Sequence, residues 1–232
     1  MHIAFDGTTI RPGRTGVGYY SEHLLRHLAA RADTDAITVI SNRAIDTEAP
    51  LPESVKTEVC AAWAPRLVWM QAHAPRLLRR LRADVVHFTN GMVPLALPVP
   101  TIVTIHDMSL TMFPRFHPPR RVALNRPFVN VAARRADAII TVSEAARRDI
   151  VRLFGIDECR VHVVHEAAAP AFRPVRDAAA LERVRDRYGL ADRFVLYVGT
   201  IEPRKNLPLL LEAFARRRRA AGLPHQRVCV GP

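Results

Sequence analysis

The chain has 232 residues, of which 49% are hydrophobic, so it can form one large domain or two smaller ones. Its net charge of +12 is carried almost entirely by arginine, because Lys56 and Lys205 are the only lysines. This charge suits solvated helix faces or anionic ligands more than nucleic acid, since zinc-finger spacing, RNP-like aromatic motifs and a continuous basic helix are all absent. The three cysteines are far apart and form no CxxC motif, so they indicate neither a disulfide framework nor a zinc site.

The N-terminal sequence enters an apolar strand at once, which leaves no room for a signal peptide. The longest apolar stretch, 92–105, is interrupted by prolines and is too short to span a bilayer. We therefore expect a cytoplasmic protein.

Strands and helices alternate along the chain. In order, the pattern predicts strands and helices at His2–Phe5 (strand), Gly16–Ala30 (helix), Ile37–Ser41 and Val55–Ala61 (strands), Arg66–Arg82 (a basic helical stretch interrupted by Pro75), Asp84–Phe88 and Thr101–His106 (strands), Pro119–Arg135 (helix), Ala138–Val142 (strand), Glu144–Phe154 (helix), Arg160–Val164 (strand), Ala178–Tyr188 (helix) and Phe194–Val198 (strand). This alternation predicts an α/β protein with a parallel, doubly wound sheet.

Prolines around Phe172–Asp177 indicate a linker between two domains. We expect a first domain over residues 1–175 and a second over 176–232. The second begins with a helix and then the strand Phe194–Val198, a glycine turn, the loop Glu-Pro-Arg-Lys-Asn and an amphipathic helix, which predicts the start of a βαβ unit.

Ligands of such sheets collect where the strands end. After the first strand, Gly16 and Gly18 open a helix and allow a backbone N–H to approach an anion. An ordinary tight turn explains this GxG about as well, and Ser21 at the third position disfavours a dinucleotide-binding GxGxxG motif.

His87 and His106 end two consecutive strands, in VVHFTNG and IVTIHD. Adjacent parallel strands would bring both imidazoles to one edge of the sheet, where Asp107 joins them. A lone histidine at a strand end is more often structural, and Asp107 is also suited to capping the following turn. Together the three residues favour a polar cleft in which His106 binds a sugar hydroxyl.

Two glutamates follow later strands. Ser143 and Glu144 start a helix, which favours capping by Ser143 and a dipole interaction for Glu144, although this helix end also faces the same edge. Glu166 follows the strand Arg160–Val164, where it is either a solvated carboxylate or part of the cleft lining.

Arg204 and Lys205 precede a predicted helix directly. Fixed cations beside unpaired helix N–H groups make a receptor for a phosphate or diphosphate.

These segments together are similar to the family 4 glycosyltransferases, from Ile3 to Val230, with IVTIHD and EPRKN as the most specific blocks. The resemblance is strongest to mannosyltransferase-like members that build bacterial surface polysaccharides. It implies the GT-B fold, in which the first of two Rossmann-like domains binds the acceptor and the second binds the nucleotide-sugar donor. It also implies transfer with retention of configuration, without a metal or other cofactor, and with GDP-mannose as the favoured donor.

The resemblance implies a role for each matching position. Gly16 and Gly18 match the glycine loop beside the donor diphosphate, His106 matches the histidine that contacts the transferred sugar, and Arg204 and Lys205 match the basic pair that neutralises the diphosphate. We expect His106, Lys205 and Arg204 to be catalytic. His87, Asp107, Glu144 and Glu166 are candidates for substrate binding with the two glycines.

The sequence departs from the family in three places. Thr200 stands where many relatives have arginine, and His165-Glu166-Ala167 replaces the usual Asn-Gly or Glu-Gly. The paired glutamates (E-x7-E) of the family would follow Pro232, so we expect a chain truncated within the second domain and inactive alone. The open sheet edge then favours a homodimer or a partner chain.

Trp63, Trp69 and the stretch Arg66–Arg82 suggest contact with the inner face of an anionic membrane, against the alternative of an ordinary surface helix. Two other functions remain open: a non-catalytic or partner-dependent subunit of a split glycosyltransferase, and another GT-B enzyme such as a nucleotide-sugar epimerase or a phosphorylase.

Overall fold

The computed structural model describes residues 1–31, 36–60 and 63–231 and divides the chain into two units, 1–167 and 168–232. The sequence places the domain boundary between residues 175 and 176, within the same coil region that precedes the helix at Ala178. The end of the expected strand Val55–Ala61 lies outside the described residues.

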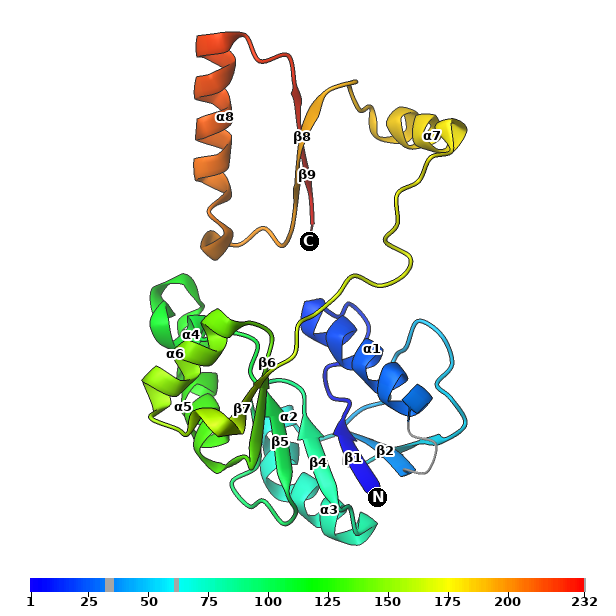
Figure 1. Cartoon of the computed structure of the whole chain (residues 1–232), viewed down its shortest axis with the longest axis vertical. Helices are drawn as coiled ribbons and strands as arrows, with labels where there is room; N and C mark the ends of the chain where they lie inside the picture. The colour runs from blue at the N-terminus through cyan, green and yellow to red at the C-terminus, as the bar shows by residue number, and fades with distance from the viewer. Residues whose placement is uncertain (32–35, 61–62, 232) are drawn as a thin grey trace. The chain divides into compact units, whose positions relative to one another are not determined.

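The N-terminal unit is built on a seven-stranded parallel sheet in the order β3-β2-β1-β4-β5-β6-β7 (Figure 1). Its strands are β1 (His2–Asp6), β2 (Ala36–Ser41), β3 (Val55–Val59), β4 (Val85–Phe88), β5 (Thr101–Thr104), β6 (Ala138–Thr141) and β7 (Val161–Val163). The helices between them are α1 (Gly16–Arg31), α2 (Arg66–Val68), α3 (Ala74–Leu81), α4 (Ser109–Met112), α5 (Pro119–Arg135) and α6 (Glu144–Phe154). The predicted α/β fold with a parallel, doubly wound sheet is confirmed.

Helices cover both faces of this sheet. Alternate residues of a strand point to opposite faces, so in β1 Phe5 packs with Leu25 of α1, whereas Ala4 joins the other core cluster. That second cluster is larger and includes Trp69, Leu78 of α3 and Ile150 of α6. Burial on both faces explains the continuous apolar character of the strands.

The basic helical stretch is interrupted as an α-helix just before Pro75, between α2 and α3, but the chain stays helical there. Proline has no N–H to donate to the carbonyl four residues earlier. The chain accommodates this with a π-helical turn at Trp69–His73, closed by the Ala74 N–H on the Trp69 carbonyl, so that Pro75 lies in the first turn of α3.

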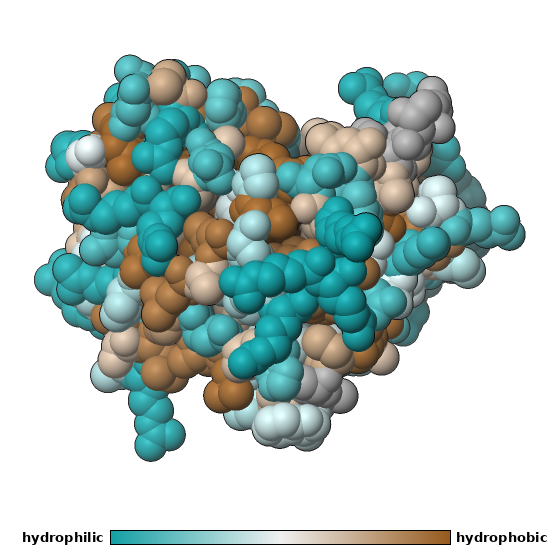
Figure 2. Space-filling model, turned by 90° about the horizontal axis from the view of Figure 1, so that it is seen from below, coloured by the Kyte–Doolittle hydropathy of each residue, from teal (hydrophilic) through white to brown (hydrophobic). Residues whose placement is uncertain are grey.

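The apolar side of this helical stretch faces the core. Trp69 is fully buried, with its Nε1–H 3.3 Å from Cys60 Sγ, and Leu77 and Leu78 are buried as well. Trp63 is 78% exposed. Figure 2 shows the face of the molecule on which α3 lies. Hydrophilic side chains are spread over this face, with hydrophobic ones between them. An interfacial helix that inserts Trp69 into lipid is therefore inconsistent with the fold.

The C-terminal unit contains α7 (Ala178–Tyr188), β8 (Phe194–Val198), α8 (Leu207–Ala221) and β9 (Gln226–Val230). β8 and β9 pair in parallel, from Phe194 opposite Gln226 to Val198 opposite Val230, and α8 connects them as a βαβ unit. Phe214 of α8 is buried against this sheet.

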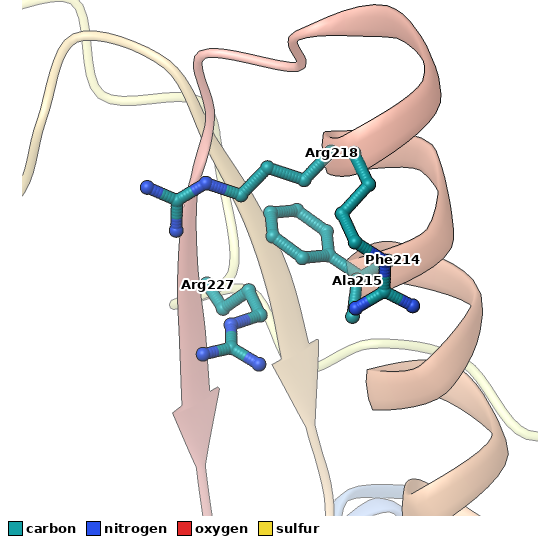
Figure 3. Close-up of a pocket in the computed structure, with 5 residues that line it drawn as sticks. Phe214, Ala215, Arg218 and Arg227 are labelled. Atoms are coloured by element: carbon teal, nitrogen blue, oxygen red, sulfur yellow. The ribbon is translucent and has the colours of Figure 1, made fainter.

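A cavity of about 350 Å³ lies beside Phe214 in this unit (Figure 3). The guanidinium of Arg227 lies 5.5 Å from the centre of the Phe214 ring, and Arg218 and Arg219 also line the cavity. Arg204 and Lys205 are not among its lining residues. This cavity is therefore separate from the predicted phosphate-binding segment.

Candidate functional site

The ends of β1, β4 and β5 bring together the residues of the candidate site in the N-terminal unit. These strands are neighbours in the parallel sheet, so the loops that follow them lie at one edge, here called the carboxyl edge. Thr89 follows β4, His106 follows β5, and the glycine segment follows β1.

Three contacts orient the His106 ring. Its Nε2 lies 3.1 Å from the carbonyl oxygen of Thr89, which can only accept, so this nitrogen donates. Its Nδ1 lies 3.4 Å from Oε1 of Glu166, and the Tyr20 ring packs edge-on with its centre 4.7 Å away. The side chain remains 18% exposed, so a fixed imidazole is accessible from solvent.

Tyr20 and Thr104 belong to this cluster, although sequence reasoning missed them. Tyr20 Oη lies 3.1 Å from Thr104 Oγ1, and the same hydroxyl lies 2.8 Å from His87 Nε2. Burial, and to a smaller degree the charge of Glu166, raises the pKa of Tyr20 against the opposing hydrogen bond from Thr104. The sequence offered one signal for Tyr20, namely its position one helical turn after Gly16, which was already a candidate site residue.

His87 lies beneath this cluster and not at its surface. Only 5% of the residue is exposed, and the ring packs edge-on against Phe5 with the centres 5.6 Å apart. Burial, with a smaller contribution from the charge of His106, lowers the pKa of His87 to about 4. His87 therefore presents almost no surface for the substrate contact that the sequence predicts. Its burial and its ring packing are those of a structural histidine.

The burial of His87 predicts acid sensitivity. Unfolded histidine has a pKa near 6.5, so below about pH 6.5 the unfolded chain binds a proton that the folded chain refuses until about pH 4. Stability should therefore fall as the pH drops through this window, by about 3 kcal/mol in total. Urea unfolding at several pH values measures this effect. The free energy of unfolding should depend less steeply on pH in His87→Gln than in the unaltered chain.

Exposed His162 offers a matched control for this experiment. His162→Gln should keep the pH dependence of the unaltered chain. An unchanged slope in His87→Gln would contradict the buried, neutral state of His87.

The two glycines of the GxG segment have different surroundings. A Cβ at Gly18 would lie 2.5 Å from Cβ of Arg14 and 2.6 Å from the carbonyl oxygen of Thr9, whereas a Cβ at Gly16 would meet nothing within 4 Å. Gly18 is therefore required for packing, and Gly16 is open to solvent at the start of α1.

Alanine substitutions should separate these two roles. Gly18→Ala forces the Thr9 backbone and Arg14 apart and should lower the free energy of unfolding by about 1–3 kcal/mol. Gly16→Ala has room for its methyl group and should change it by less than about 1 kcal/mol. Urea denaturation of both variants measures the difference, and equal losses would contradict the assignment.

The other predicted residues lie along the same edge with different partners. Asp107 Oδ1 accepts from the backbone N–H and the hydroxyl of Ser109, at 2.8 and 2.6 Å, and so caps the turn into α4. Ser143 caps α6 through the Ala146 N–H, and exposed Glu144 lies 3.7 Å from Arg147. The contact with His106 makes half-exposed Glu166 the member of this set that joins the central cluster.

In the C-terminal unit, Arg204 and Lys205 lie in a short 3-10 turn between β8 and α8. Asn206 adopts a left-handed conformation, with φ of 51°, which ends this turn and starts α8. Arg204 is paired with Glu202 at 2.7 Å, while the Lys205 side chain has no hydrogen-bonding or ionic partner within the described part of the chain. Lys205 is thus an exposed, uncompensated cation directly before a 15-residue helix.

Among the described residues, no group of three or more His, Cys, Asp or Glu side chains is arranged to hold a metal ion. In the same part of the chain, every helix is too short or too polar to cross a bilayer.

Comparisons with known proteins place this arrangement in a family. The sequence model described as Glycosyltransferase Family 4 matches residues 14–170. The O-antigen chain mannosyltransferase B of Escherichia coli is 29% identical over 230 residues, which cover 92% of this chain and 60% of that protein.

Solved structures share the fold. WaaG, a glycosyltransferase involved in lipopolysaccharide biosynthesis, superposes with a TM-score of 0.67 at 14% identity, over 99% of this chain and 63% of that one. HepE of Anabaena, solved with UDP-glucose, gives a TM-score of 0.63 at 17% identity, over 99% and 59%. The chain thus spans about three fifths of the length of these proteins. With its parallel sheet, the following βαβ unit and a family match over more than half of its residues, the chain belongs to glycosyltransferase family 4.

Proposed function

We propose that this chain binds a nucleotide sugar and takes part in the retaining transfer of a hexose, with mannose favoured, to a glycan or lipid-linked acceptor in surface polysaccharide synthesis. The observation that carries the proposal is the uncompensated Lys205 directly before α8, in a chain of this family. The name of the E. coli relative, an O-antigen mannosyltransferase, supports mannose as the transferred sugar. We propose GDP-mannose as its donor.

Lys205 supplies the electrostatic part of the mechanism. Breaking the glycosidic bond leaves a nucleoside diphosphate, on which negative charge develops. A fixed ammonium group and a helix N-terminus stabilise that charge more strongly in the transition state than in the ground state. Arg204 contributes less, because Glu202 already neutralises it.

His106 supplies the sugar-binding part. Thr89, Glu166 and Tyr20 hold its ring in one orientation, which reduces the entropy lost when a sugar hydroxyl binds. Glu166 adds an exposed carboxylate beside it, which can accept a hydrogen bond from the sugar or the acceptor.

A panel of ligands tests the donor by thermal unfolding. A ligand at 100 times its dissociation constant stabilises the folded state by about 2.7 kcal/mol. GDP-mannose should raise the unfolding temperature more than UDP-glucose at equal concentration, and mannose alone should not raise it. A larger shift with UDP-glucose would contradict the mannose donor, and no shift with either would contradict nucleotide-sugar binding.

The proposal places the chain in the cytoplasm, in peripheral contact with an anionic membrane through arginine side chains and without insertion. Arg76 and Arg79 of α3 are exposed, while Leu77 and Leu78 of the same helix are buried. Each such cation near an anionic surface contributes about 1 kcal/mol, screened by salt. Co-sedimentation with anionic vesicles should be lost at high salt and weakened in the double variant Arg76→Gln/Arg79→Gln; equal binding to neutral vesicles would contradict it.

A further inference from the structure

A small polar pocket lies at the carboxyl edge of the N-terminal unit, apart from the His106 cluster. It has a volume of about 90 Å³ and is lined by residues from three segments: Thr8 and Arg11 after β1, Asn42 and Arg43 after β2, and Arg66 at the start of α2. Three arginines, two from loops and one from the start of α2, thus line one pocket, and none of the described residues that line it is acidic.

Arg66 is held in place by the protein. Its Nε–H donates to Thr8 Oγ1 at 3.0 Å, and its Nη2 lies 3.6 Å from Oδ2 of the fully buried Asp6. Nη2 is itself buried and makes no hydrogen bond, so Asp6 balances the charge of Arg66 but leaves part of its donor capacity unused.

Arg11 and Arg43 are not balanced in this way. Both are exposed, and within residues 1–31, 36–60 and 63–231 neither guanidinium has a hydrogen bond or a carboxylate partner. This distinguishes them from neighbouring Arg14, which is paired with buried Glu22 at 2.8 Å. The pocket therefore has an anchored guanidinium at one side and two uncompensated ones at its mouth.

We propose that this pocket binds one phosphate group of a phosphate ester, separately from the donor diphosphate at Lys205. Guanidinium groups bind phosphate through paired N–H donors, and the Thr8 and Asn42 side chains add polar contacts. Pockets for whole ligands usually occupy about 300–1,000 Å³, so a 90 Å³ pocket accommodates a single oxyanion group and not a sugar nucleotide. This inference rests on the proposed function in one respect only, namely that the acceptor carries the phosphate group.

Inorganic phosphate is the probe for the test, titrated at low salt by calorimetry into the 232-residue chain. Arg11→Gln and Arg43→Gln should each weaken phosphate binding about tenfold or more, because each removes a charge-assisted contact. Both side chains are exposed and unpaired, so the fold should be retained. Arg120→Gln makes the same change of charge at an exposed position outside the pocket and should leave the affinity unchanged.

Two results would overturn the proposal. Equal weakening by Arg120→Gln would show a general charge effect, and weakening by Lys205→Gln alone would assign all phosphate binding to the C-terminal unit. The proposed function can fail independently of this pocket. If the chain does not bind GDP-mannose but binds phosphate in a way that depends on Arg11 and Arg43, the proposed donor is wrong and the phosphate pocket is still supported.

Competition identifies the source of the phosphate. Mannose 1-phosphate and a short-chain phosphatidic acid should be compared as competitors of inorganic phosphate in the unaltered chain and in Arg43→Gln. Stronger competition by the lipid supports a lipid-linked acceptor, and stronger competition by the sugar phosphate supports a phosphorylated glycan. Failure of both to compete would overturn the assignment to a phosphate ester.

Discussion

Replacing Glu22 with glutamine is expected to lower the free energy of unfolding by about 3–5 kcal/mol, the cost of breaking a buried ion pair. Glu22 is 2% exposed and lies between two arginines: its Oε1 accepts from Arg26 Nη2 at 2.8 Å, and its Oε2 lies 2.8 Å from Arg14 Nη2. The Arg14 side chain is itself only 8% exposed.

The same carboxylate joins the loops that surround the candidate site. Its Oε1 also accepts from the Glu48 backbone N–H at 2.9 Å, while Arg14 donates to the Asp46 carbonyl at 2.7 Å. Because Arg14 packs against Gly18, the loss of Glu22 should loosen the glycine segment and the loop after β2 together.

Urea unfolding followed by tryptophan fluorescence measures this effect in the right unit, because Trp63 and Trp69 both belong to the N-terminal one. Glu53→Gln removes the same charge from an exposed position and should change stability by less than about 0.5 kcal/mol. A loss below about 1 kcal/mol in Glu22→Gln would contradict the role of Glu22 as a buried anchor.

Lys205→Ala is expected to weaken binding of a GDP nucleotide about 10- to 100-fold, because it removes the charged contact that we propose for the diphosphate. Arg204→Ala should have a smaller effect, since Glu202 already pairs with Arg204. Displacement of a fluorescent GDP derivative measures both.

The chain offers a close control for this experiment in Lys56, its other lysine, which is exposed on the edge strand β3. Lys56→Ala should leave nucleotide affinity unchanged, and Lys205→Arg should retain part of it. A change of less than about twofold in Lys205→Ala, or an equal change in Lys56→Ala, would exclude Lys205 from the donor site.

Much of the fold could be predicted because its long elements carry strong local signals. Helices such as α5 and α6 have the predicted bounds, with Ser143 as the N-cap of α6. The helix α4 was missed because four residues are too few to show a periodic pattern. The π-helical turn before Pro75 was missed because a proline alone does not reveal how its missing hydrogen bond is compensated.

The candidate site could be located from the sequence, but its internal contacts could not. The ends of parallel strands indicated the position of His106. The burial of His87 was not predictable, because both faces of this sheet are covered and the alternation of a strand does not distinguish them. Gly16 and Gly18 likewise differ only in their three-dimensional neighbours.

Calorimetric titration of GDP-mannose into the 232-residue chain tests the central claim most directly. We predict saturable binding at one site per chain, with competition by GDP, because Lys205 is an uncompensated cation at the start of α8. Enzymes usually bind such substrates with constants between about 1 μM and 1 mM. Absence of binding at millimolar concentrations of both GDP-mannose and UDP-glucose would contradict a nucleotide-sugar site in this chain.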